Sequence, residues 1–199
     1  MIKKLIVKSI LAGILIGIAA CIYMSCDNKY IGALLFSLGL CAVLILEANL
    51  FTGKIGYVNS GKKFLLSNLI LVFNLIFAYL IGLLYKVCIG NPVQNVGARF
   101  INFIWYAVLF KGFITGICIY LAVEMYKKTN SVIPVILGVA GFILSGSYHC
   151  IADACYLGAS TFSWSSLLYI LLVIVGNSLG SLLIRVLQVG LLNKRKENN

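Results

Sequence analysis

Acidic side chains are scarce in this sequence: five Asp and Glu residues stand among 199, against 16 Lys and Arg. Charged residues of both signs amount to only 11%, whereas 62% of the residues are hydrophobic and the mean hydropathy is +1.06. A soluble domain of this length could not bury so much apolar surface, which excludes that class. The composition predicts an integral membrane protein with helical spans.

Histidine is limited to one residue, His149, in the stretch SGSYHCIADAC. A zinc site needs three or four converging ligands, and helical spacing would place Cys150 about 100° around the axis from His149. We therefore predict no metal site and no cofactor. The seven cysteines are scattered mostly through apolar segments, without the spacing of a secreted disulfide framework, so we expect free thiols.

Apolar runs long enough to cross a bilayer, about 20 residues each, occur six times: Leu5 to Met24, Ile31 to Ile55, Phe64 to Val87, Phe100 to Met125, Val132 to Leu157 and Ser165 to Leu192. Short polar or turn-rich segments separate them, so residues 1–199 are expected to form a single transmembrane domain. The N-terminal stretch MIKKLIVKSILAGILIGIAAC imitates a cleavable signal, but the equally apolar remainder favours a first membrane helix.

The basic residues are distributed unevenly. If the N-terminus is cytoplasmic, only Lys29, Lys86 and Arg99 fall outside and Lys111 lies within a span. The other basic residues fall at inside ends and loops: Lys3, Lys4, Lys8, Lys54, Lys62, Lys63, Lys127, Lys128, Arg185, Lys194, Arg195 and Lys196. This asymmetry predicts a multi-pass protein of the cell (inner or plasma) membrane with both termini in the cytoplasm. The net charge of +11 is then topological, and nucleic-acid binding is the weaker interpretation.

Polar, glycine-containing stretches interrupt the second and fifth runs, LEANLFTGK in one and SGSYHCIADAC in the other. Broken helices at equivalent positions of two halves indicate a permeation site, because irregular backbone is tolerated in a membrane only where it lines a cavity. The sequence therefore predicts an all-α integral membrane fold of six transmembrane helices in a 3+3 inverted repeat, with helices two and five broken.

A histidine at bilayer depth is a functional residue by default, although His149 could instead be a core histidine bonded to a neighbouring carbonyl. Asp153, one helical turn further on, could hold the imidazole or cap the restarted half-helix. In the other interruption Thr52 offers a hydroxyl. Glu47 could pair with a cation, of which Lys111 is the one available at depth, or it could titrate.

Several fragments, in the right order, resemble the formate/nitrite transporter family of pentameric anion channels. KSILAGILIGIAA is similar to its first helix, LFTGK to its Leu-Phe-Thr break, and KGFITGICIYLAV to its fourth helix. SGSYHCIA and VGNSLGS resemble its helix-five break and its helix-six Gly-Asn motif. The resemblance implies an aquaporin-like fold, one pore in each subunit and a homopentamer in the lipid bilayer.

The resemblance also implies residue roles. His149 is similar to the central pore histidine, Thr52 to the hydroxyl that faces it, and Asn177 to the helix-six asparagine. Tyr148 stands where the family has a glutamate, and its hydroxyl could face the pore or pack between helices. Leu50 and Phe51 would form the cytoplasmic constriction, and the outer one would be formed by Phe36, Leu40, Phe142 and Ile119.

Other positions depart from the family pattern. The lysine near the start of helix four is absent, and Arg99 lies one position from its place. Gly116 and Asp153 replace asparagines, the latter four residues after the histidine. Asn49 replaces the acidic residue before Leu-Phe-Thr, with Glu47 two positions back. These departures bear on substrate choice and pH response and leave the pore architecture intact.

The expected function is a membrane channel or transporter for small monovalent anions and their weak acids. Formate and nitrite come first, and hydrosulfide, acetate and lactate remain open; the substrate would pass in protonated or proton-coupled form. One alternative is a membrane-embedded enzyme using His149, Cys150 and Asp153. Another is a water- or glycerol-like pore, against which the two prolines, Pro92 and Pro134, argue because no pair of Asn-Pro-Ala stretches is present.

Overall fold

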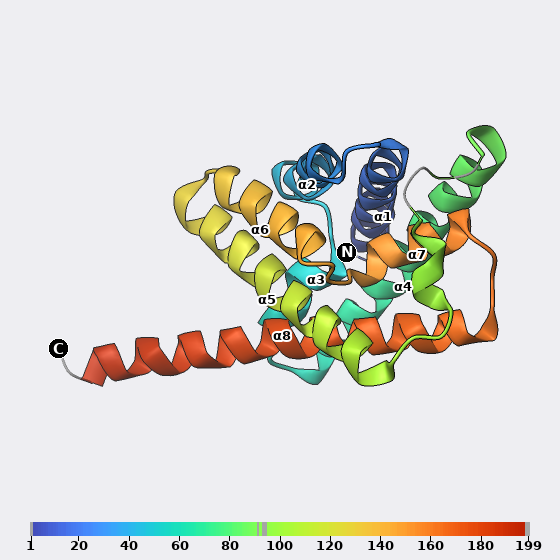
Figure 1. Ribbon diagram of the computed structural model, residues 1–199. Helices are drawn as coiled ribbons and strands as arrows, with labels where there is room; N and C mark the ends of the chain where they lie inside the picture. Colours follow the sequence, from blue (N-terminus) through green and yellow to red (C-terminus); the bar gives the residue numbers. More distant parts are fainter. Residues whose placement is uncertain (1, 91, 93–94, 198–199) are drawn as a thin grey trace.

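The computed structural model describes residues 2–197 except 91, 93 and 94, with side chains as far as Leu191. The predicted orientation relied in part on three basic residues whose side chains lie outside the described part: Lys194, Arg195 and Lys196. The described chain is helical (Figure 1), with two 3-10 turns, η1 and η2. The elements are α1 Ile2–Ser25, α2 Lys29–Ile45, α3 Phe51–Lys54, η1 Ile55–Tyr57, α4 Gly61–Cys88, η2 Gly97–Phe100, α5 Trp105–Thr129, α6 Ile133–Leu144, α7 Cys150–Ala159 and α8 Trp164–Glu197.

Four helices, α1, α4, α5 and α8, are long and apolar enough to cross a membrane, which confirms the predicted all-helical membrane architecture. The second apolar run is divided into the shorter helices α2 and α3, and the fifth run is divided into α6 and α7. The fourth run was expected to be helical from Phe100, but α5 begins only at Trp105. The reason is local, because Ile101 is extended and Asn102 has a φ of 52°, which a helix does not accept.

Short polar residues set several helix ends. The side chain of Asn28 accepts the amides of Tyr30 at 2.9 Å and Ile31 at 3.2 Å, and so caps α2. Ser60 caps α4 in the same way, and α5 ends at Asn130 in the left-handed conformation, with a φ of 53°. Asparagine and serine are favoured at these ends because they satisfy the free amides or tolerate the left-handed backbone.

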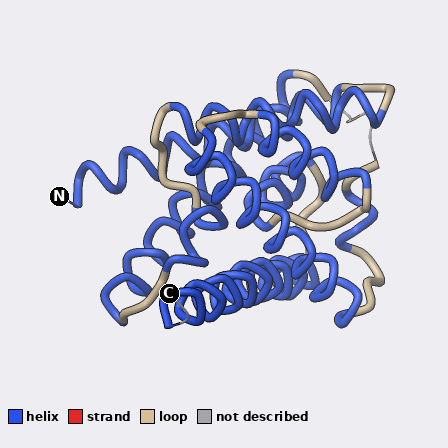
Figure 2. The backbone as a smooth tube through the Cα atoms, turned by 90° about the vertical axis from the view of Figure 1, so that its left-hand side faces the viewer, coloured by secondary structure: helices blue, strands red, loops and turns tan. Residues whose placement is uncertain are grey.

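The long helices pack in two pairs, α1 against α4 and α5 against α8, and α7 lies on α4. Figures 1 and 2 show α8 along one side of the molecule, and Figure 1 shows it extending beyond the other helices at its C-terminal end. The α5–α8 contact is close at Gly116, where an added Cβ would lie 2.2 Å from the Asn177 carbonyl oxygen. A side chain at this position would push the two backbones apart.

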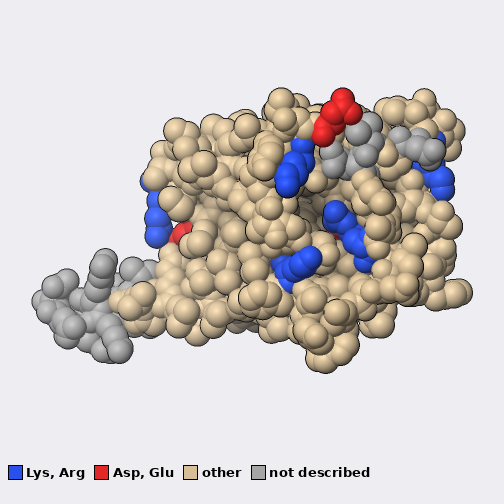
Figure 3. Space-filling model, viewed as in Figure 1, with Lys and Arg blue, Asp and Glu red and all other residues tan. Residues whose placement is uncertain are grey.

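The outer faces of the helices remain apolar. Large hydrophobic side chains are exposed on α2, α4, α6 and α8, among them Leu38, Leu84, Leu137 and Val186. Figure 3 shows basic side chains around a hollow on one face, with acidic side chains at few places. Apolar outer faces with polar residues kept inside suit a bilayer or neighbouring apolar subunits.

Candidate permeation site

The two helix breaks share the same backbone turn. Glu47 and Gly146 both have positive φ, 50° and 70°. The next amide in each break, of Ala48 or Ser147, donates to the carbonyl five residues back at 2.8 or 2.9 Å. These bonds use carbonyls that the end of a helix leaves free, so each half-helix ends in an ordered turn rather than in an irregular loop.

Asn74, in the middle of α4, ties the first break together. Its side chain is fully buried. The amide oxygen accepts the Phe51 amide at 2.8 Å, and the amide nitrogen donates to the carbonyls of Ser9 at 2.7 Å and Asn49 at 3.0 Å. Asn74 thus links the start of α3, the segment before it and α1. Asn74 was not among the residues predicted from the sequence, although an asparagine inside an apolar span was a usable signal.

Asn177, in α8, does the same for the second break. Its oxygen accepts the Cys150 amide at 3.0 Å, and its nitrogen donates to the carbonyls of Gly112 at 2.8 Å and Tyr148 at 2.9 Å. The predicted pore residue Asn177 is therefore fully buried and has its amide group occupied by backbone.

Replacing Asn74 with alanine is expected to lower the free energy of unfolding by about 1–3 kcal/mol, because the buried Phe51 amide loses its acceptor. Thermal unfolding of the purified protein in detergent measures the change. Asn68→Ala is the matched control on the same helix, since the Asn68 side chain donates only to the local Phe64 carbonyl. Equal shifts in the two variants would contradict the role assigned to Asn74.

His149 and Thr52 meet where the two breaks face each other. His149 Nε2 and Thr52 Oγ1 are 2.9 Å apart, and both side chains are buried. His149 Nδ1 accepts the Ala152 amide at 3.2 Å, so His149 is itself the N-cap of α7. Because Nδ1 is an acceptor, the proton of the neutral ring belongs on Nε2, which donates to the Thr52 hydroxyl.

A small cavity of about 90 Å³ reaches His149 from the side of α6 and α7, and Phe36 and Phe142 line it as well. The two phenyl rings meet edge to face at 6.3 Å, and the Phe142 ring stacks on the imidazole at 5.9 Å. Two predicted constriction residues therefore lie together on one side of His149. Ile119, a third, is buried in α5.

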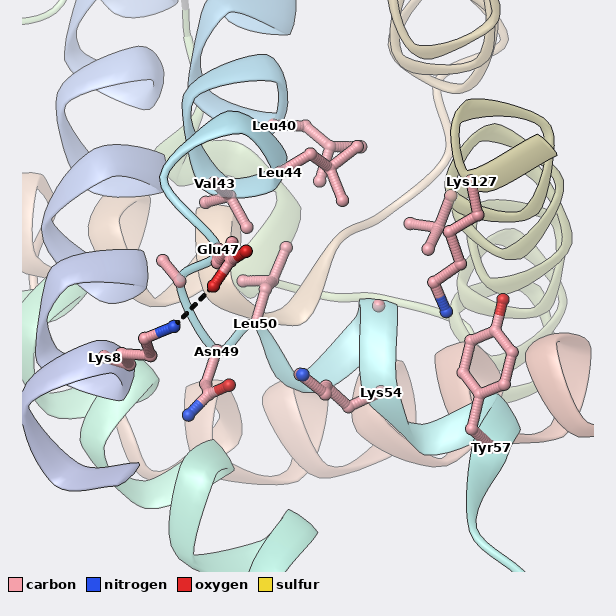
Figure 4. Close-up of a pocket in the computed structure, with 13 residues that line it drawn as sticks. Lys8, Leu40, Val43, Leu44, Glu47, Asn49, Leu50, Lys54, Tyr57 and Lys127 are labelled. Carbon is pink, nitrogen blue, oxygen red and sulfur yellow. Dashed lines mark hydrogen bonds and ion pairs between the residues drawn. The ribbon is translucent and has the colours of Figure 1, made fainter. Parts of the chain in front are cut away.

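A larger cavity of about 540 Å³ opens on the other side, beside the first break (Figure 4). Leu40 and Leu50 line it. Leu40 thus shares a cavity with the predicted cytoplasmic residue Leu50, whereas Phe36 lines the opposite one. Phe51 is buried directly after Leu50. Lys54 and Lys127 lie on two sides of the cavity in Figure 4.

Glu47 at the edge of this cavity pairs with Lys8, whose Nζ lies 3.1 Å from its carboxylate (Figure 4). Of the alternatives left open for Glu47, pairing with a cation is observed, but the partner is not Lys111, which donates to the Tyr148 hydroxyl at 3.2 Å on the other side of the breaks. The Glu47 side chain is 82% exposed. At such an exposed position the pair contributes little to stability.

Tyr57, at the C-terminal end of η1, contacts a cluster formed by Glu124, Lys127 and Gln188, which was not predicted from the sequence. The Tyr57 hydroxyl donates to Glu124 at 2.6 Å, and Gln188 donates to the same carboxylate at 2.8 Å. Lys127 Nζ lies 3.5 Å from the centre of the Tyr57 ring. These contacts join η1 to α5 and α8.

Asp153 does not hold the imidazole, and His149 rather than Asp153 provides the cap of α7. The Asp153 carboxylate instead accepts from Arg99 Nη1 at 2.7 Å. Tyr148 turns away from the small cavity: its hydroxyl meets Lys111, and its ring packs 5.3 Å from Tyr169. Neither of the two roles left open for Asp153 is observed, because its carboxylate pairs with Arg99 and the His149 side chain accepts the Ala152 amide.

The cysteine thiols take no part in the hydrogen bonds of His149 and Thr52 described above. Six of the described cysteines, Cys21, Cys41, Cys88, Cys118, Cys150 and Cys155, are free thiols. The sulfurs of Cys21 and Cys155 lie 3.9 Å apart. Within the described residues, His, Cys, Asp and Glu side chains form no group of three that could hold a metal ion.

Comparison with known proteins identifies the family. A family model described as formate/nitrite transporter matches residues 1–192, and no curated protein sequence matches. A solved structure described as an FNT family ion channel has a TM-score of 0.83 at 20% identity, over 94% of this chain and 88% of its own. A second, described as a pentameric formate channel with formate bound, has a TM-score of 0.78 at 21% identity, over 99% and 98%. The two structures show a shared fold, and the family match over nearly the whole sequence shows that this membrane protein belongs to the formate/nitrite transporter family.

Proposed function

We propose that this protein is a membrane channel through which a small monovalent anion, formate or nitrite first, crosses as its neutral weak acid. The observation that carries the proposal is the 2.9 Å contact between His149 and Thr52 at the meeting point of the two breaks. Cavities on the two sides of the breaks, and the family membership of the chain, support it. The formate bound to one structural relative supports the substrate class.

The pore would lie between two inverted halves of three helices each. In this arrangement α1, α2 with α3, and α4 form one half, and α5, α6 with α7, and α8 form the other. The matched turns at Glu47 and Gly146 and the matched bonds of Asn74 and Asn177 support the repeat. Each asparagine joins the start of a half-helix to the first helix of its own half.

The neutral acid is the form that suits this site. Moving an anion into a low-dielectric segment without a partner costs many kcal/mol. The His149 and Thr52 pair offers neutral hydrogen-bond groups, since the imidazole carries one proton in the observed arrangement. A low dielectric also raises the pKa of a bound acid. The anion therefore takes up a proton before the narrow segment and releases it beyond.

The narrow segment would have an aromatic side and an aliphatic side. Phe36 and Phe142 line the outer cavity, and Leu40 and Leu50 line the inner one. Ile119 and Phe51 are buried, and we assign them to the aromatic and the aliphatic side in turn. Apolar side chains at both positions exclude hydrated ions and leave room for small neutral molecules. Asn177 and Tyr148 act on the pore through the backbone of the second break.

Transport fits the site better than catalysis. A thiol enzyme needs a base that activates Cys150, but both imidazole nitrogens of His149 are engaged, one with Ala152 and the other with Thr52. The Cys150 side chain is fully buried. The protein is therefore proposed to bind its substrate only in transit, without cofactor or metal.

The assembly is proposed to be a homopentamer in the cell membrane, with both termini in the cytoplasm. The exposed apolar faces and the pentameric relative support the oligomer. The larger cavity, with Lys8, Lys54 and Lys127, would then face the cytoplasm and attract anions there.

Uptake of radiolabelled formate or nitrite into proteoliposomes tests the proposal. Flux should exceed that of empty vesicles and rise about ten-fold for each unit by which the outside pH is lowered, because the neutral fraction of a weak acid rises in this way above its pKa. Empty vesicles at each pH give the passive leak to subtract. No flux for either substrate would refute the channel, and flux independent of pH would refute the neutral-acid mechanism.

A further inference from the structure

Arg99 is held rigidly beside the outer cavity. Its Nη1 donates to Asp153 Oδ1 at 2.7 Å, and its guanidinium carbon lies 4.8 Å from the centre of the Tyr156 ring and 5.3 Å from that of Tyr148. The Asp153 side chain is fully buried, whereas 21% of the Arg99 side chain is exposed. A carboxylate and two aromatic faces therefore orient a cation that remains accessible.

The guanidinium reaches the cavity that contains His149. Arg99 and His149 both line this space of about 90 Å³, which is the volume of about three water molecules in the liquid. Arg99 also lines a wider pocket of about 260 Å³ together with Lys111 and Tyr148. It thus stands between the wider pocket and the cavity at the histidine.

Among the described residues, the ion pair leaves hydrogen-bonding groups without a partner on both Arg99 and Asp153. In the described part of the chain, Arg99 donates one hydrogen bond, through Nη1, out of the five N–H groups of a guanidinium. Asp153 Oδ2 is buried and lacks a hydrogen-bond partner among the described residues. A two-pronged Arg–Asp pair would have occupied one edge of the guanidinium, but this pair uses a single contact.

We propose that Arg99 selects the substrate on the outer side of His149, by donating two parallel hydrogen bonds to the two oxygens of a planar oxyanion. A carboxylate or nitrite matches this fork, whereas hydrosulfide and chloride present a single atom and cannot engage both donors. The inference rests on the proposed function and names its preferred substrate class. Asp153, Tyr148 and Tyr156 are positioning residues, because they act by orienting the guanidinium.

Flux ratios in proteoliposomes test the proposal. Arg99→Lys keeps the charge and removes the fork, so formate and nitrite flux should fall about ten-fold, corresponding to one charge-assisted hydrogen bond, while hydrosulfide flux stays near that of the unmodified protein. Lys86→Met removes an exposed lysine and should leave the ratio of formate or nitrite flux to hydrosulfide flux unchanged. An equal loss for all substrates, or an unchanged ratio, in Arg99→Lys overturns the proposal. A protein that carries none of these substrates instead refutes the proposed function itself.

A second measurement needs no substitution. Phenylglyoxal modifies accessible arginines, and mass spectrometry of the Arg99 peptide gives the rate for this residue. Formate or nitrite should slow the modification of Arg99, and chloride at the same concentration should not. Equal protection by chloride, or no protection by either oxyanion, overturns the proposal even if Arg99→Lys fails to assemble.

Discussion

Replacing His149 with alanine is expected to lower formate and nitrite flux about ten- to hundred-fold, which corresponds to about 1.4–2.8 kcal/mol, the cost of leaving a buried hydrogen-bonding group without its partner. The imidazole supplies the donor that faces Thr52 at 2.9 Å, and alanine leaves nothing in its place. Stopped-flow or radiolabel uptake at a fixed pH difference measures the change, with each preparation normalised to the amount of protein inserted in the vesicles.

His149→Asn separates transport from folding. Asparagine is a good N-cap, so it can accept the Ala152 amide as the imidazole does, but it is too short to replace the contact with Thr52. The variant should keep the thermal stability of the unmodified protein and lose most of the flux. Thr52→Val should reduce flux while Thr52→Ser retains it. Normal flux in a well-folded His149→Asn protein would contradict the central role of the imidazole.

Gly116→Ala is expected to have the largest effect on stability, about 3 kcal/mol, at the upper end of the range for overpacking. The new methyl group would lie 2.2 Å from the backbone oxygen of Asn177, so α5 and α8 must separate. The movement also displaces Asn177 and therefore its bond to Cys150. Thermal unfolding in detergent measures the loss of stability, and flux should fall with it.

Gly190→Ala is the matched control for this substitution. Gly190 lies in α8, the helix against which Gly116 of α5 packs, but an added Cβ at Gly190 meets nothing within 4 Å. Because alanine favours a helix over glycine by about 1 kcal/mol, this variant should be slightly more stable than the unmodified protein. A loss of stability in Gly116→Ala together with a gain in Gly190→Ala would support the close packing of α5 on α8. A change in the same direction in both variants would refute it.

Much of the architecture could be predicted because hydropathy is a local property. Apolar runs of about 20 residues predict membrane spans wherever they occur, and glycine-containing polar stretches inside two of them predicted the breaks that the structure has after α2 and α6. The same reasoning drew attention to His149 and Thr52. It failed at residues 101–104, where a run that is apolar except for Asn102 is not helical, because hydropathy does not report backbone conformation.

The side-chain partners were not predictable in this way. Lys111 was the cation that the sequence offered for Glu47, which pairs with Lys8. The sequence left Asp153 either at the imidazole or at the cap of the half-helix, and it pairs with Arg99. Each choice depends on which helix packs beside which and on the direction in which the side chain leaves the backbone. Asn74 passed unnoticed for the same reason, since its importance lies in a bond to Phe51 on another element.

The sequence by itself determined that this protein lies in a membrane, where its spans run, and where two of them are interrupted, since each of these follows from neighbouring residues alone. Only the tertiary structure decided that the two interruptions meet at His149 and Thr52, that a buried asparagine holds each of them, and that Arg99 stands beside the outer cavity. The physical reason is that a buried polar group must find its partner, and the packing of the helices determines which partner lies within reach.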